Sequence, residues 1–242
     1  MLPVLQLGPF ALQVPGMVLL ASIWLGLQLS ESRADKRQVN SENIGNLVLV
    51  TLLAALLGAR IGYALRFPQA FLEHPSGLIS LNPGLLDPWA ASAAALLGAL
   101  VFAQRKDMSL WPSLDALSPL FASLSLGLTL SSAASGQGYG APAQLPWAIQ
   151  LWGASRHPSQ IYEALAAVLI LLVVLRRGKK EAAPGVLFMD LVIYSAGARL
   201  LLEAFRAESH LLPNGWRIEQ MLAWLILAAA FWARHQRLRL AS

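Results

Sequence analysis

Residues 44–66 decide the fold class, because they form an apolar stretch long enough to cross a bilayer. They read IGNLVLVTLLAALLGARIGYALR, in which only Arg60 and Arg66 are charged. A transmembrane helix needs about 20 predominantly apolar residues. Six further apolar stretches lie at 10–29, 88–104, 113–131, 161–175, 184–205 and 217–233. The sequence therefore predicts an all-α integral membrane protein, a bundle of about seven transmembrane helices. A count of six or eight stays open, because two of the stretches are short.

The composition of the whole chain supports the same class. Of its 242 residues, 56% are hydrophobic and only 13% are charged, whereas a soluble domain carries about 25% charged residues. These values argue against a soluble enzyme, a coiled coil, a disordered chain and a nucleic-acid-binding protein, although the net charge is +5. The chain has no cysteine, which excludes disulfides, thiolate catalysis and cysteine-ligated metal. We expect neither a metal ion nor a cofactor.

The positions of the basic residues predict an orientation in the membrane. Twelve of the eighteen Lys and Arg residues, including every Lys, follow alternate apolar stretches, in the segments 33–37, 105–106, 176–180 and 234–239. The positive-inside rule places these segments in the cytoplasm. The N-terminus is then outside and the C-terminus cytoplasmic. We interpret 1–242 as a single transmembrane domain, with 67–87 and 131–157 as outer loops or interfacial segments.

The other six basic residues are all arginines on the predicted outer side, namely Arg60, Arg66, Arg156, Arg199, Arg206 and Arg217. Any one of them could simply extend toward outer-leaflet phosphates. Arg199, Glu203 and Arg206 have the spacing i, i+4 and i+7, which predicts one shared helical face. A charged stripe within a span normally faces the interior of the bundle or a wet cavity, and guanidinium suits phosphate. We therefore expect a phosphate-facing site in which Glu203 holds the arginines in place.

The most specific motif of the chain is the octapeptide at 156–163, RHPSQIYE. Together with GARIGY at 58–63 and the arginine stripe, it resembles the prolipoprotein diacylglyceryl transferase family. The resemblance implies a seven-span protein of the bacterial inner membrane. It also implies transfer of a diacylglyceryl group from phosphatidylglycerol to the lipobox cysteine of a prolipoprotein. The expected partners are thus a phospholipid and a prolipoprotein, and no nucleic acid.

The resemblance and the residue chemistry together suggest roles for the polar side chains. The candidate catalytic residues are His157, Arg199 and Glu203, and the candidate substrate-binding residues are Arg60, Arg156, Gln160, Glu163 and Arg206. His157 is a possible base or phosphate ligand, but it also precedes Pro158, so it could simply cap a helix. Gln160 and Glu163 could tie helices together instead of contacting substrate.

Several positions depart from the family pattern, among them Ser132 and Ser135, where the family carries asparagine, and four where it carries a titratable side chain. Where the family carries Tyr, His, Arg and Glu, this chain carries Pro15, Ala93, Thr129 and Gln137. Three hypotheses follow. The first is an active or specialised diacylglyceryl transferase, and the second is an inactive paralogue that serves as a lipid-binding or membrane-complex subunit. The third is a small transporter or flippase, which is disfavoured because the sequence shows no inverted repeat.

Overall fold

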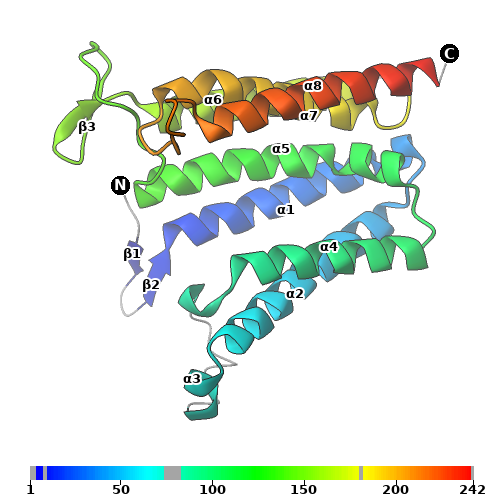
Figure 1. Ribbon diagram of the computed structural model, residues 1–242. Coiled ribbons are helices and arrows are strands. Elements are labelled where there is room, and N and C mark those ends of the chain that lie inside the picture. The colour runs from blue at the N-terminus through cyan, green and yellow to red at the C-terminus, as the bar shows by residue number, and fades with distance from the viewer. Residues whose placement is uncertain (1–3, 8–9, 74–82, 180–181, 241–242) are drawn as a thin grey trace. The chain divides into compact units, whose positions relative to one another are not determined.

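The computed structural model describes residues 4–7, 10–73, 83–179 and 182–240. Seven helices of 17 residues or more occur in these residues, one at each predicted apolar stretch. They are α1 (Val14–Ala34), α2 (Ser41–Arg66), α4 (Pro88–Arg105), α5 (Leu110–Ser135), α6 (Ser159–Arg177), α7 (Val186–Leu202) and α8 (Ile218–Arg239) (Figure 1). The predicted helical class is confirmed. Among the described residues, four of these helices (α1, α2, α5 and α6) are long and apolar enough to cross a membrane.

The first apolar stretch differs from its prediction, which began a helix at residue 10. Instead, β2 (Phe10–Gln13) pairs antiparallel with β1 (Val4–Leu7), with Val4 opposite Gln13. Helix α1 begins only at Val14. Pro15 therefore lies in the first turn of the helix, where its missing N–H costs no hydrogen bond.

The chain forms two compact units, one comprising 1–33 with 114–242 and the other comprising 34–113. In the smaller unit, α2 packs closely against α4 through small residues. A Cβ atom added to Gly58 would lie 2.2 Å from the Cβ of Ala94, and one added to Gly62 would lie 2.2 Å from the Cβ of Ala90. Close packing of small residues is typical of helix pairs in membranes, where burial of apolar surface does not drive association.

Hydrogen bonds and an ion pair between polar residues stabilise one end of this helix pair. Asp87 caps α4 by accepting a hydrogen bond from the backbone N–H of Ala90 at 2.8 Å. This hydrogen bond lowers the pKa of Asp87 although burial opposes the shift, and Arg66, with its Nη1 3.4 Å from the carboxylate, lowers it further. Arg60 donates a hydrogen bond to the carbonyl of Leu85 at 3.1 Å, in the short 3-10 turn that precedes Asp87.

In the larger unit, α1 packs against α5 where a proline interrupts the helix. Pro119 lies inside α5, and a proline weakens the backbone ladder around it. The buried Ser30 hydroxyl of α1 accepts a hydrogen bond from the backbone N–H of Leu120 at 3.1 Å. Gly26 allows the close approach, because a Cβ there would lie 2.9 Å from the Cα of Leu120. A side chain of α1 therefore satisfies a backbone donor that lipid could not.

Helices α6, α7 and α8 run side by side in the same unit (Figure 1). Asp115 of α5 is 1% exposed, and its two carboxylate oxygens accept hydrogen bonds from the N–H groups of Gly185 and Phe188, each at 2.8 Å. It thereby caps the start of α7 from another helix. Asp190 of α7 pairs with Arg177 of α6 and with Arg234 of α8. These two acids hold one end of the helix group, and α7 carries Arg199 near the other end.

Candidate functional site

The loop between α5 and α6 is built into the end of the helix group by backbone hydrogen bonds. It contains the hairpin of β3 (Ile149–Leu151) and β4 (Ala154–Arg156). On one side, the N–H of Ala141 donates to the carbonyl of Phe205 at 2.8 Å, and the N–H of Ala207 donates to the carbonyl of Tyr139 at 3.1 Å. On the other side, the N–H of His157 donates to the carbonyl of Ala141 at 3.0 Å. The loop thus joins the start of α6 to the end of α7.

Four charged side chains meet where these segments come together. Arg199 Nε lies 2.9 Å from Glu203 Oε2, and Arg206 Nη1 lies 2.7 Å from Glu163 Oε1. The same Glu163 oxygen lies 3.8 Å from Arg199 Nη1. A single carboxylate oxygen is therefore shared by two guanidinium groups. The structure brings together four of the predicted site residues, from α6, from α7 and from the segment after α7.

The four side chains differ sharply in exposure. The exposed fraction is 0% for Glu203, 14% for Glu163, 16% for Arg206 and 41% for Arg199. Burial disfavours the charged form of Arg206, but the hydrogen bond and charge of Glu163 outweigh it, so the pKa of Arg206 is raised. Arg199 is thus the cation of this cluster that is open to a ligand.

The predicted helical stripe is wrong in one respect. Helix α7 ends at Leu202, Glu203 begins the 3-10 turn η4 (Glu203–Phe205), and Arg206 is extended, with φ −82° and ψ 143°. The three charged residues therefore do not share one α-helical face. The physical reason is tertiary, since Arg217 donates hydrogen bonds to the carbonyls of Glu203 and Arg206. These bonds stabilise the chain where it leaves the helix.

Glu203 is held from both sides of its carboxylate. The Ser209 hydroxyl donates to Oε1 at 2.6 Å and in turn accepts a hydrogen bond from Arg217 at 3.1 Å. Oε2 faces Arg199 without the alignment of a hydrogen bond. The buried carboxylate is thus oriented by Ser209, and its charge is directed at Arg199.

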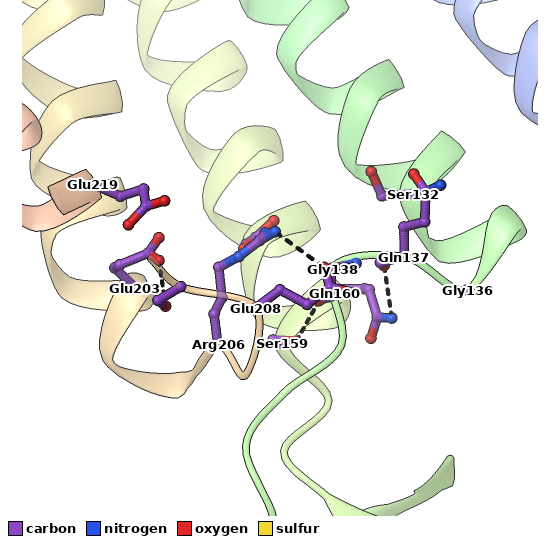
Figure 2. Close-up of polar contacts among 12 residues, drawn as sticks. Ser132, Gly136, Gln137, Gly138, Ser159, Gln160, Glu203, Arg206, Glu208 and Glu219 are labelled. Atoms are coloured by element: carbon purple, nitrogen blue, oxygen red, sulfur yellow. Dashed lines mark hydrogen bonds and ion pairs between the residues drawn. The ribbon is translucent and has the colours of Figure 1, made fainter. Parts of the chain in front are cut away.

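The first turn of α6 holds the glycine-rich part of the loop (Figure 2). Ser159 donates from its hydroxyl to the carbonyl of Gly138 at 2.7 Å, and Gln160 donates from its amide to the carbonyl of Gln137 at 3.1 Å. The N–H of Gly138 donates to Glu208 at 2.9 Å. Gly138 has φ +68°, which favours glycine, and a Cβ there would lie 3.3 Å from Arg206 Nη1. Gln160 therefore contacts the loop that borders the charged cluster.

Arg156 and His157 lie at the end of the loop, just before α6. The ring of His157 packs 5.1 Å from that of Phe205, and its Nδ1 is buried without a hydrogen-bond partner. Arg156 donates to the carbonyls of Leu151 at 3.0 Å and Gly140 at 3.3 Å. A Cβ on Gly140 would lie 2.2 Å from the carbonyl oxygen of His157, so only glycine fits beside this segment. The catalytic role of His157 and the binding role of Arg156 stay predictions.

Two hollows lie against Arg199. One of about 120 Å³ is lined by residues of α5, α6 and α7, including Thr129, Glu163 and Arg199. The other, of about 300 Å³, is almost entirely apolar, and its wall includes Phe188 and Arg199. Arg199 thus combines an exposed guanidinium with adjacent apolar space, an arrangement that suits an amphiphile with a phosphate group. Thr129, one of the departures from the family pattern, faces the smaller hollow.

Several contributors were not among the predicted site residues. They are Gly138, Ser159, Glu208, Ser209 and Arg217. Glu208 and Ser209 directly follow Arg206 in the sequence, but nothing in a short polar turn tells which way its side chains point. The predicted Arg60 belongs to the other compact unit. Within the described residues, no group of three or more His, Asp or Glu side chains could hold a metal ion.

Comparison with known proteins matches the chain along nearly its whole length. The family model described as prolipoprotein diacylglyceryl transferase matches residues 3–234. A relative from Trichormus variabilis is 28% identical, with 91% of this chain and 84% of the relative covered. One from Thermosynechococcus vestitus is 26% identical, with 94% and 89% covered. One from Ligilactobacillus salivarius is also 26% identical, with 96% and 92% covered. All three are named phosphatidylglycerol–prolipoprotein diacylglyceryl transferase. With an RHPSQIYE segment that contributes Glu163 to the charged cluster, the chain belongs to the prolipoprotein diacylglyceryl transferase family.

Proposed function

We propose that this protein transfers a diacylglyceryl group from phosphatidylglycerol to the cysteine thiol of a prolipoprotein. The observation that carries the proposal is Arg199, a 41% exposed guanidinium beside two hollows and held by a fully buried carboxylate. The relatives are named after this reaction, which favours an active enzyme over an inactive paralogue. No observation favours a transporter.

The reaction is an alkyl transfer to sulfur. The thiol loses its proton to a base, and the thiolate attacks the glyceryl carbon that bears the phosphate. A carbon–sulfur bond forms, the carbon–oxygen bond breaks, and the electron pair leaves with the phosphate oxygen as glycerol phosphate. Charge on the phosphate grows as that bond breaks, so a fixed cation lowers the barrier. His157 stays the candidate base from the sequence.

Each charged residue then has a role that its contacts support. Arg199 binds the phosphate and stabilises the charge that develops on the leaving oxygen. Glu203 orients Arg199 through its Nε and leaves the other nitrogens for the ligand. Arg206 is less exposed and is bound to Glu163, so it adds positive potential to the site without contacting the phosphate directly. The apolar hollow bordered by Phe188 accommodates acyl chain.

We also propose that the protein crosses the bacterial inner membrane seven times, with its N-terminus outside and its C-terminus in the cytoplasm. The alternation of basic segments along the chain supports this orientation. Because the chain has no cysteine, single cysteines introduced at Asp35 and at Trp152 allow a clean test. A membrane-impermeant thiol reagent should label the Trp152→Cys protein in intact cells and the Asp35→Cys protein only after lysis. The reverse pattern would contradict the orientation.

The activity is tested with purified protein, phosphatidylglycerol carrying a labelled diacylglyceryl group, and a lipobox peptide. We expect labelled peptide with the native chain and a rate lower by about 10²–10³ for Arg199→Gln. A peptide with serine in place of cysteine is the control for the acceptor. No product with Arg199 intact would refute the proposal. Product made only by the Thr129→Arg variant would identify the native chain as the inactive paralogue.

A further inference from the structure

Glu163 lies between the two arginines that the proposed reaction needs. Its Oε1 contacts Arg206 Nη1 at 2.7 Å and Arg199 Nη1 at 3.8 Å. The second distance is that of a loose ion pair. A loose pair on a 41% exposed guanidinium contributes little to stability. The contact is therefore easily exchanged for another anion.

The carboxylates of the protein already outnumber the two arginines of the cluster. Arg199 and Arg206 contact three carboxylates, those of Glu163, Glu203 and Glu208. Glu203 approaches the Nε of Arg199, whereas Glu163 approaches Nη1. A ligand anion that binds Arg199 on its Nη side must therefore compete with Glu163. Glu203 can stay in place while this happens.

We infer that Glu163 is a displaceable anion, which occupies the phosphate position on Arg199 when substrate is absent and returns to it when the leaving group departs. The inference rests on the proposed function and assigns Glu163 a role in release, distinct from binding. A phosphodiester carries one negative charge, whereas the glycerol phosphate that leaves carries up to two, because its second pKa is near 6. Two arginines without Glu163 would hold that product too tightly. The carboxylate repels it and recovers Arg199 at the same time.

The test is equilibrium binding of a phosphate ester to the full-length protein in nanodiscs. Glycerol phosphate is the soluble probe, inorganic phosphate reports the phosphate alone, and phosphatidylglycerol in phosphatidylcholine nanodiscs reports the lipid. We expect Glu163→Gln to bind glycerol phosphate about fivefold more tightly than the native chain. In turnover, the variant should show stronger product inhibition and a lower kcat. A merely structural role for Glu163 predicts weaker binding of glycerol phosphate by this variant, because Arg206 would lose its ion-pair partner.

The matched control is Glu219→Gln. Glu219 lies in the same compact unit, but its carboxylate pairs with His210, and its exposed fraction is 22%. This variant should change the affinity for glycerol phosphate less than twofold. If Glu163→Gln does not fold, Glu163→Asp decides, because it keeps a charge near Arg206 but withdraws it from Arg199. It should bind more tightly than the native chain, by a smaller factor.

The outcomes separate this inference from the proposed function. Equal or weaker binding of glycerol phosphate by the folded Glu163 variants would overturn the inference, even if the native chain transfers diacylglyceryl. Tighter binding by Glu163→Gln, with no transfer by any chain, would support the displaceable anion and refute the transferase. Tighter binding of inorganic phosphate alone, with no change for glycerol phosphate or the lipid, would also overturn the inference, because the site would then not be shaped for an ester.

Discussion

Asp115→Ala should destabilise the larger unit strongly without altering the chemistry at Arg199. Asp115 is 1% exposed, and it accepts hydrogen bonds at 2.8 Å from the N–H groups of Gly185 and Phe188. A hydrogen bond to a charged group contributes about 1.5–3 kcal/mol, so two contribute about 3–6 kcal/mol. Removal of a buried charge returns part of its desolvation cost, so the lower half of this range is expected. For a chain of this size, each kcal/mol shifts Tm by about 2–4 °C, and the expected fall is about 10 °C.

The assay is thermal unfolding in detergent, followed by the fluorescence of the eight tryptophans. Asp115→Asn keeps a carbonyl acceptor and should cost about half as much. Asp35→Ala, at an exposed acid, is the control and should leave Tm unchanged. The cap and Arg199 lie at opposite ends of α7, about 20 Å apart at 1.5 Å per residue, so transfer well below Tm should persist. A fall in Tm below about 2 °C for Asp115→Ala would refute the reasoning.

Three further changes have distinct expected results. Glu203→Gln should lower the transfer rate about 10²-fold, because a misplaced Arg199 loses its alignment with the phosphate. Tm should change little, because glutamine keeps a carbonyl that accepts from Ser209 and removes a buried charge. Gly140→Ala should lower Tm, because the new Cβ would lie 2.2 Å from the His157 carbonyl oxygen. Such overpacking lowers the free energy of unfolding by about 1–3 kcal/mol. Asp87 has a lowered pKa in the folded protein, so its stabilisation is present above the unfolded pKa of about 3.9 and is lost as the pH falls further. Asp87→Asn should therefore lose less stability than the native chain between about pH 6 and pH 3, in urea unfolding.

Each of these changes has a control in the same chain. Glu219→Gln removes a carboxylate that pairs with His210, and should retain most of the activity. Gly197→Ala places a Cβ where no atom lies within 4 Å and should be neutral or slightly stabilising. For the pH dependence, Glu42→Gln at an exposed position should follow the native curve. If a control variant changed activity or stability as much as its test variant, the contact removed in the test variant would not be the cause of the change.

The positions of the seven helices could be predicted from the sequence because their signal is local. An apolar stretch such as 44–66 forms a helix in lipid whatever surrounds it, since every backbone group must be satisfied within the segment. The start of α1 was predicted four residues too early, at residue 10. Hydropathy alone does not distinguish a short apolar strand such as β2 from the start of an apolar helix. The evidence for a strand is its pairing with β1, which lies outside the apolar stretch.

The candidate site was predictable in its residues but not in its geometry. The arginines stood out because cations are scarce on the outer side of a membrane protein, and this led to Arg199 and Arg206. That Arg206 lies beyond the end of α7 could not be predicted, because Arg217, eleven residues further on, stabilises the chain there. The role of Gln160 in holding the glycine-rich loop depends on a contact across 23 positions, for which the sequence has no periodic signal.

The sequence by itself determined that this is a membrane protein, where its helices lie along the chain and to which family it belongs. Each of these depends on local composition or on a short motif. Only the tertiary structure decided that Arg199 is the exposed cation, that Glu203 is fully buried behind it, and that Glu163 reaches Arg206 across 43 positions in the chain. The physical reason is that burial and ion pairing depend on which helices pack together and how their ends are stabilised. No residue carries that information alone.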